Sequence, residues 1–117
     1  MSHDPGCPFC KRVAAGEFEP TDLGQVVSFI PLRPVTVGHR LFLPTAHVTS
    51  AMEAPWATGR CMQAAAQYAR YWREAYPSFN LITSAGADAT QTVMHLHIHL
   101  VPRCAGDGLT LPWTGQP

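Results

Sequence analysis

The sequence predicts an α+β domain in which one long helix lies on a mostly antiparallel sheet. Four short segments are rich in β-branched and aromatic residues, and one alanine-rich stretch has helical periodicity. Proline or glycine stands at almost every boundary between these segments. With 117 residues, the chain is expected to form a single domain over 1–117.

Glycine and proline bound each element of the first half. A short N-terminal helix is expected over 9–15, because Gly16 follows it as a helix stop. Val, Ile and Phe predict a strand over 26–30. A second strand is expected over 40–43, where Pro44 stops it.

The second half begins with the long helix, which is expected over 56–74. Its predicted apolar face recurs every three to four residues and consists of Trp56, Met62, Ala66, Ala69 and Trp72 or Arg73. Strands are expected over 79–83 and 93–101, with a loop of small residues over 84–90 between them. An irregular tail is expected from about residue 104.

Charge and hydropathy exclude several classes of partner. The formal net charge is +0 and charged residues make up 14% of the chain, without a basic block, so no nucleic-acid interface is expected. No apolar run approaches the length of about 20 residues that a membrane span needs. The first residues are polar and do not form a signal peptide, so a cytoplasmic location is expected. In that compartment paired cysteines indicate metal or redox chemistry rather than a structural disulfide.

Three histidines alternate with aliphatic residues in the last predicted strand. Because successive side chains of a strand point to opposite faces, His95, His97 and His99 are expected to share one face. Clustered imidazoles repel one another when protonated, so this pattern has little structural use and indicates a functional site. Neutral imidazole acts near neutral pH as a nucleophile, a proton shuttle or a metal ligand.

A Cys-x-x-Cys pair, Cys7 and Cys10, stands near the N-terminus. The pair alone fits either a zinc site or a redox site. No strand is predicted before Cys7, which counts against a thioredoxin-like arrangement. Zinc needs two further ligands, for which His39, His47 and one histidine of the triplet are the candidates.

Three blocks of the sequence together resemble the histidine triad (HIT) family. Residues 91–103 contain the pattern His-φ-His-φ-His-φ-φ, where φ is apolar. Residues 38–44, followed by His47, and residues 7–10, followed by Gly16 and Glu17, occur in the family order. The resemblance implies a HIT-like α+β fold and a homodimer that binds a purine nucleotide and releases a nucleoside monophosphate. Members of the family hydrolyse nucleoside phosphoramidates or dinucleoside polyphosphates, or transfer nucleotidyl groups.

The resemblance also implies roles for individual residues. His97 would be the catalytic nucleophile, and His99 would hold the phosphate and assist the leaving group. A structural zinc ion would be held by Cys7, Cys10, His47 and His95. The residues expected to contact the substrate are Ser84, Gln91, Thr92 and His39. For His39 the alternative is a core histidine that is hydrogen-bonded to backbone.

The chain departs from the family pattern at three positions. Pro31 stands where an acidic residue commonly binds the ribose hydroxyls, so the sugar specificity is left open. Ser84 replaces a common asparagine, and Thr90 replaces a glycine ahead of the histidines. Trp113 in the tail is expected either to pack locally or to cover a pocket of its own or the partner subunit.

The sequence therefore predicts a hydrolase or nucleotidyl transferase acting at the α-phosphate through a covalent nucleotidyl-histidine intermediate. One alternative is a nucleotide-binding module with little catalysis, and Pro31 and Ser84 are its support. A second is a small zinc module for nucleic acid, against which the neutral charge counts. A third is a hydrolase with all three triad histidines on one zinc ion, which is disfavoured because same-face strand residues stand about 7 Å apart.

Overall fold

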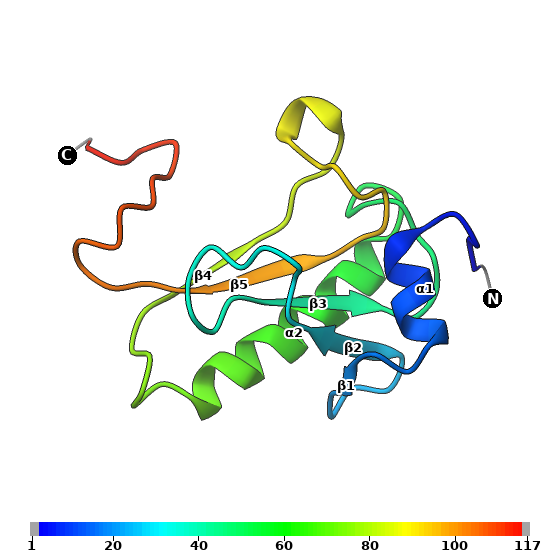
Figure 1. Cartoon of the computed structure of the whole chain (residues 1–117), viewed down its shortest axis with the longest axis horizontal. Helices are drawn as coiled ribbons and strands as arrows, with labels where there is room; N and C mark the ends of the chain where they lie inside the picture. Colours follow the sequence, from blue (N-terminus) through cyan, green and yellow to red (C-terminus); the bar gives the residue numbers. More distant parts are fainter. Residues whose placement is uncertain (1–2, 116–117) are drawn as a thin grey trace.

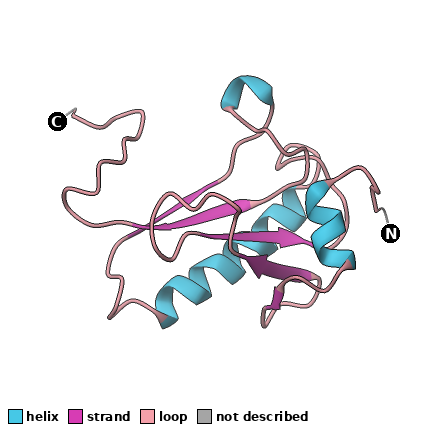
Figure 2. Cartoon of the chain, viewed as in Figure 1, coloured by secondary structure: helices cyan, strands magenta, loops and turns pink. Residues whose placement is uncertain are grey.

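The computed structural model describes residues 3–115. Its elements, in chain order, are α1 (Pro8–Ala14), β1 (Glu19–Pro20), β2 (Val26–Phe29), β3 (Arg40–Pro44), α2 (Pro55–Tyr71), β4 (Phe79–Ile82), the 3-10 turn η1 (Ala87–Ala89) and β5 (Ile98–Pro102). Figures 1 and 2 show one long helix and one short N-terminal helix around a single sheet. The predicted α+β class is confirmed.

The sheet has five strands in the order β1-β2-β3-β5-β4, and all neighbouring strands are antiparallel. β5 enters the sheet between β3 and β4, so the C-terminal half of the histidine segment becomes a central strand. Leu41 of β3 lies opposite Phe29 on one side and opposite His99 on the other. This register places the end of the histidine segment beside the middle of the sheet.

The two faces of the sheet bury different side chains. Phe42, Ile98 and Leu100 pack with residues of α2 in the main core. Leu41 and Leu43 point the opposite way and form a second apolar cluster, which Phe9 and Val13 of α1 and Phe18 cover. The alternation of side chains along a strand thus divides the core into an α2 face and an α1 face.

The long helix was predicted correctly, but its buried face only in part: Met62 and Ala69 pack against the core, whereas the two tryptophans do not lie within it. Trp56 is 70% exposed and Trp72 is 40% exposed. The fully covered positions carry small side chains: Cys61, Ala64 and Ala65. Small side chains let the helix axis approach the sheet closely, which leaves the wide aromatic rings at the margins. The helix also ends at Tyr71 rather than near residue 74.

The last strand is shorter than predicted. β5 begins at Ile98, so of the three triad histidines only His99 lies in the strand. Residues 93–95 form a bend and residues 96 and 97 are irregular, and the Leu96 N–H donates to the Val48 carbonyl at 2.7 Å. On one side β4 ends at Ile82, opposite His99, and on the other the pairing with β3 stops at Phe42, opposite Ile98, so residues 93–97 pair with neither strand.

Two further features complete the chain. The two-residue strand β1 was not predicted; it pairs with β2 at the edge of the sheet. After β5, residues 103–115 contain no helix or strand, and the Arg103 side chain fixes the start of this tail by pairing with Asp107 at 2.7 Å. Within residues 3–115, no helix is long and apolar enough to cross a membrane.

Candidate active site and metal centre

The three triad histidines divide between two neighbouring groups. His95 is completely buried and its ring centre lies 5.1 Å from that of His47. The rings of His97 and His99 lie 4.9 Å apart, and that of His39 lies 5.2 Å from His99. The irregular backbone over residues 93–97, with its bend at 93–95, therefore turns His95 toward the N-terminal arm and leaves His97 and His99 together.

The first group places two thiols and two imidazoles around a common centre. The ligating atoms of Cys7, Cys10, His47 and His95 all lie within 4.8 Å of one another. The His95 Nδ1 atom is 3.4 Å from the Cys7 Sγ atom and 3.6 Å from the Cys10 Sγ atom, and the His47 Nδ1 atom is 3.5 Å from the Cys10 Sγ atom. A tetrahedral zinc ion with ordinary bond lengths requires nitrogen–sulfur separations of about 3.5 Å. These four residues therefore fit a zinc ion.

Hydrogen bonds prepare this group for a metal. The His95 Nε2–H donates to the Pro44 carbonyl at 2.8 Å, which leaves the lone pair of Nδ1 facing the thiols. Burial lowers the pKa of His95 to about 4, which keeps the ring neutral and able to ligate. The outer Nε2 atom of His47 lies 3.8 Å from the Asp4 carboxylate. Partners of this kind commonly orient metal-bound histidines.

The second group fixes the orientation of the His97 ring. The His97 Nδ1–H donates to the His95 carbonyl at 2.6 Å, so the lone pair of the neutral ring lies on Nε2. Burial lowers the pKa of His97, which favours that neutral form near pH 7. Phe9 packs edge-to-face on the ring at 5.0 Å between centres. These contacts fix the tautomer and the ring plane of His97, and they leave Nε2 as its unprotonated nitrogen.

A chain of hydrogen bonds fixes His99 in the opposite tautomer. The Val35 N–H donates to the His39 Nδ1 atom at 3.0 Å, so neutral His39 carries its proton on Nε2. That Nε2–H donates to the His99 Nδ1 atom, also at 3.0 Å. Because its Nδ1 atom accepts this bond, neutral His99 carries its proton on Nε2, and this N–H donor lies beside His97. His39 is buried and bonds to backbone, as the alternative for it expected, and it also orients His99; its contact with a substrate stays a prediction.

Comparison with known proteins agrees with this geometry. The family model named HIT domain matches residues 21–106. The chain belongs to the HIT family. A Zn-bound histidine triad family protein from Mycobacterium smegmatis is 32% identical with a TM-score of 0.75, covering 91% of this chain and 81% of that one.

Two relatives of this HIT protein have named enzymatic activities. Adenosine 5'-monophosphoramidase HNT1 of Saccharomyces cerevisiae is 28% identical, and the match covers 97% of this chain and 73% of that protein. Adenylylsulfatase HINT3 of Arabidopsis thaliana is 30% identical, and the match covers 88% of this chain and 55% of that protein. Both names describe chemistry at an adenylyl group.

Hydrogen bonds of the Gln91 side chain stabilise the loop that precedes the histidines in this HIT domain. The side-chain amide of Gln91 accepts from the Gly86 N–H at 2.9 Å and donates to the carbonyls of Thr49 and Val93. Gln91 thus braces the loop, while Ser84 is half-buried and Thr92 is exposed. Thr92 lines a cavity of about 310 Å³ together with Cys7 and His47, on the metal side of the site. Contacts of Ser84, Gln91 and Thr92 with a substrate stay predictions.

Two residues of the site were not singled out from the sequence. Phe9 packs on both His95 and His97. Its place between the two cysteines of the Cys-x-x-Cys pair is the signal that could have identified it. The Thr83 hydroxyl donates to the His97 carbonyl at 2.8 Å, and no sequence pattern marks that contact.

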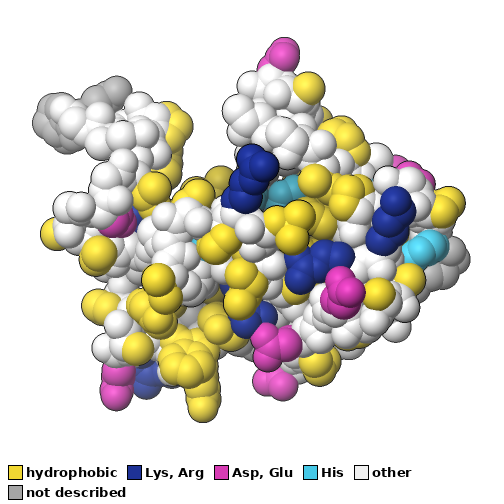
Figure 3. Space-filling view, viewed as in Figure 1, with side chains coloured by type: hydrophobic (Ala, Val, Ile, Leu, Met, Phe, Trp, Pro, Cys, Tyr) yellow, Lys and Arg dark blue, Asp and Glu magenta, His cyan; other side chains and the backbone are white. Residues whose placement is uncertain are grey.

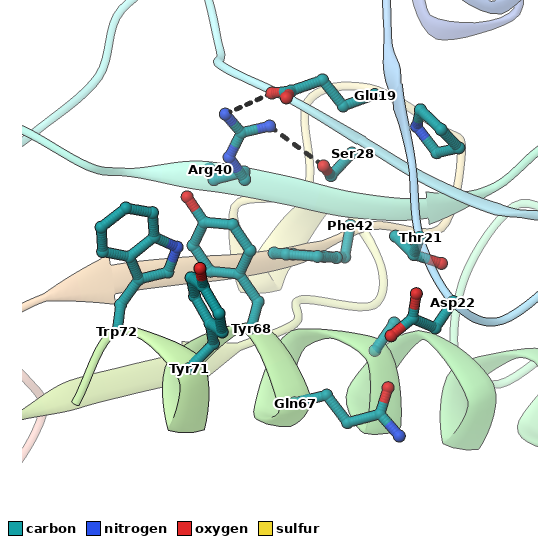
Figure 4. A pocket seen from close by; sticks show the side chains of 12 residues that line it. Glu19, Thr21, Asp22, Ser28, Arg40, Phe42, Gln67, Tyr68, Tyr71 and Trp72 are labelled. Carbon is teal, nitrogen blue, oxygen red and sulfur yellow. Dashed lines mark hydrogen bonds and ion pairs between the residues drawn. The ribbon is translucent and has the colours of Figure 1, made fainter.

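A further cavity of about 350 Å³ lies on the other face of the sheet. It opens between α2 and strands β1 to β3, and Figure 4 shows Tyr68, Tyr71 and Trp72 rising from the helix along its wall. On its upper side the Arg40 guanidinium pairs with the Glu19 carboxylate at 2.6 Å and donates to the Ser28 hydroxyl at 3.0 Å. No histidine or cysteine lines this cavity, so the reactive groups all belong to the α1 face.

Proposed function

We propose that this HIT protein is a nucleotide hydrolase or nucleotidyl transferase that acts at the α-phosphate and forms a covalent bond between phosphorus and His97. The hydrogen bond from the His97 Nδ1–H to the His95 carbonyl carries the proposal, because it leaves the Nε2 lone pair for attack. The named activities of the yeast and plant relatives support the same reaction class.

The first step forms a bond between the His97 Nε2 atom and the α-phosphorus. The bond from phosphorus to the leaving group breaks, and the leaving group keeps the electron pair and takes up a proton. His99 directs its Nε2–H toward the departing atom or the phosphoryl oxygens, where negative charge develops. The half-buried position of both rings strengthens these interactions relative to those in water.

The second step returns His97 to its starting state. Water, or the acceptor of a transfer reaction, attacks phosphorus, and the bond to His97 breaks. With water, the product is a nucleoside monophosphate, and His97 regains its lone pair. One difficult displacement is thereby divided into two easier ones. Ser84, Gln91, Thr92 and the backbone near His99 are the proposed further contacts with the phosphate.

We propose a structural zinc ion for Cys7, Cys10, His47 and His95. Four protein ligands complete a tetrahedral site, so the ion supports the site and does not bind substrate. The described contacts transmit that support: the His95 carbonyl holds His97, and Phe9 packs on the His97 ring. A homodimer, a purine nucleotide as ligand and a cytoplasmic location remain proposals that rest on the family resemblance.

The test measures monophosphate release from adenosine 5'-phosphoramidate and from a diadenosine polyphosphate. The wild type should release monophosphate, and His97→Ala should fold normally and lose turnover by several orders of magnitude. Nucleotide binding without release by the wild type would instead select the binding-module alternative, which the substitutions at Pro31 and Ser84 favour. Substantial turnover by His97→Ala would exclude His97 as the nucleophile.

A further inference from the structure

The face that carries the nucleophile extends into a depression at the edge of the sheet. This depression has a volume of about 290 Å³, and Arg12, Glu17, Phe18, Phe29 and Ile30 are among the residues that line it. In the space-filling view, basic and acidic side chains lie next to one another on the same face as an exposed histidine (Figure 3).

The depression lies within reach of a nucleotide held by the histidines. Phe29 and His99 both lie opposite Leu41, so they stand on the same face two strands apart. Two strand spacings amount to about 10 Å. Phe9 bridges the gap, with its ring centre 5.0 Å from that of His97 and 5.3 Å from that of Phe29. A nucleotide with its phosphorus at His97 therefore extends over Phe9 and brings its base to the depression.

Arg12 is held in one orientation within the depression. Its guanidinium carbon lies 3.8 Å from the centre of the Phe29 ring, and one N–H donates to the Ile30 carbonyl at 2.9 Å. The Arg12 Nε atom lies 4.0 Å from the Glu17 carboxylate. Within residues 3–115, no hydrogen bond engages the other N–H groups of Arg12. The depression thus presents N–H donors of Arg12, held in one orientation, beside the exposed carboxylate acceptor of Glu17.

This order of donors and acceptors matches the edge of guanine. Guanine carries two adjacent acceptors, N7 and O6, which an arginine binds in bidentate fashion. On the other side of O6, the adjoining Watson–Crick edge carries N1–H and the 2-amino group, which are donors that suit a carboxylate. Adenine has an amino donor in place of O6, which faces the arginine donors unfavourably.

We propose that Arg12 and Glu17 recognise the base and that the site takes guanine nucleotides in preference to adenine nucleotides. The inference rests on the proposed function, because it needs the phosphate to lie at His97. Arg12 and Glu17 are specificity residues and take no part in the chemical steps.

The test measures binding of GMP and AMP by calorimetry to the full-length, zinc-loaded protein. We expect GMP to bind at least about tenfold more tightly than AMP, since a good bidentate pair discriminates by at least that factor. Arg12→Ala and Glu17→Gln should each weaken GMP binding and leave AMP binding nearly unchanged. The matched control is Arg70→Ala, an exposed arginine at the end of α2, which should keep the wild-type ratio. If Arg12→Ala fails to fold, Glu17→Gln preserves the test, because its side chain keeps the same shape.

Equal affinities of the wild type for GMP and AMP would overturn the inference. So would a preference for GMP that survives in both variants. Equal binding together with His97-dependent turnover would contradict only the base assignment, whereas failure of both nucleotides to bind would contradict the proposed function as well.

Discussion

At the scale of single residues, backbone partners give chemically identical imidazoles different tasks. The Pro44 carbonyl leaves the lone pair of His95 on Nδ1, which suits its proposed role as a metal ligand. The His95 carbonyl leaves that of His97 on Nε2, which suits its proposed role as the nucleophile. The Val35 N–H fixes His39 as a donor toward His99. Sequence alternation identified the cluster, but it could not distinguish the roles, because those depend on which nitrogen meets which backbone atom.

The first prediction concerns His39 as a positioning residue. Replacing His39 with alanine removes the donor that holds the His99 proton on Nε2, so we expect kcat to fall by up to about 100-fold with little change in KM. Nitrogen-15 NMR of the imidazoles should show that His99 loses its single tautomer. An unchanged His99 tautomer in His39→Ala would contradict the hydrogen-bond chain.

The second prediction concerns the pH dependence of stability. Burial is the largest cause that lowers the pKa of His99 to about 4, and neighbouring His97 and His39 act in the same direction. In the unfolded chain the pKa is about 6.5, so between pH 6.5 and pH 4 the unfolded state binds more protons than the folded state. The contribution of His99 to stability is therefore fully present above pH 6.5 and is lost as the pH falls toward 4.

Urea unfolding of the wild type and His99→Asn at several pH values between 7.5 and 4 measures this contribution. The free energy of unfolding should fall less steeply with decreasing pH in the variant. Parallel curves for the two proteins would show that His99 titrates alike in the folded and unfolded states.

At the scale of elements, the two helices have different sources of stability. α2 is long and rich in alanine, so its existence was predicted from the sequence alone. α1 has seven residues, and isolated helices shorter than about 12–15 residues are marginal in water. Two kinds of contact attach α1 to the rest of the molecule. Phe9 and Val13 pack on the sheet, and the two cysteines lie against His47 and His95. The N-terminal arm is therefore the element that we expect to depend on metal.

The third prediction is that removing the metal loosens this arm before the rest of the fold. Chelation should lower the melting temperature and raise amide hydrogen exchange in α1 and in residues 93–97, with little change in α2. Cys10→Ser should reproduce these effects, whereas Cys104→Ser, which alters an exposed cysteine outside the cluster, should not. Equal exchange in α1 with and without chelator would contradict a structural metal centre.

Errors in the predicted elements have physical causes. The length of β5 depends on its pairing with β3 and β4, whose residues stand far earlier in the chain. β1 has two residues and acquires its strand conformation only by pairing with β2. Part of the buried face of α2 was misassigned because hydrophobicity favours Trp56, while close approach to the sheet favours Ala64 and Ala65. Local patterns do not contain these tertiary constraints.

At the scale of the whole molecule, one sheet separates a structural face from a reactive face. α2 covers the first, and α1 lies over the second (Figure 1). The second face carries the cysteine-histidine cluster, the proposed nucleophile and the depression at Arg12. Cys7 and His95 are 88 positions apart, so the sequence alone gave candidates for the metal site and only the family resemblance selected among them. The contact of Arg12 with Phe29 has no local signature and required the structure.

The central claim at this scale is that the reactive face forms a covalent nucleotidyl-protein intermediate. The most direct measurement mixes the zinc-loaded protein with guanosine or adenosine 5'-phosphoramidate, quenches within milliseconds in alkali and locates the adduct by peptide mass spectrometry. We predict a nucleoside monophosphate on His97, which forms and decays at rates compatible with turnover and is missing from His97→Ala. Turnover without any adduct on the protein, or an adduct on another residue that persists in His97→Ala, would contradict the account.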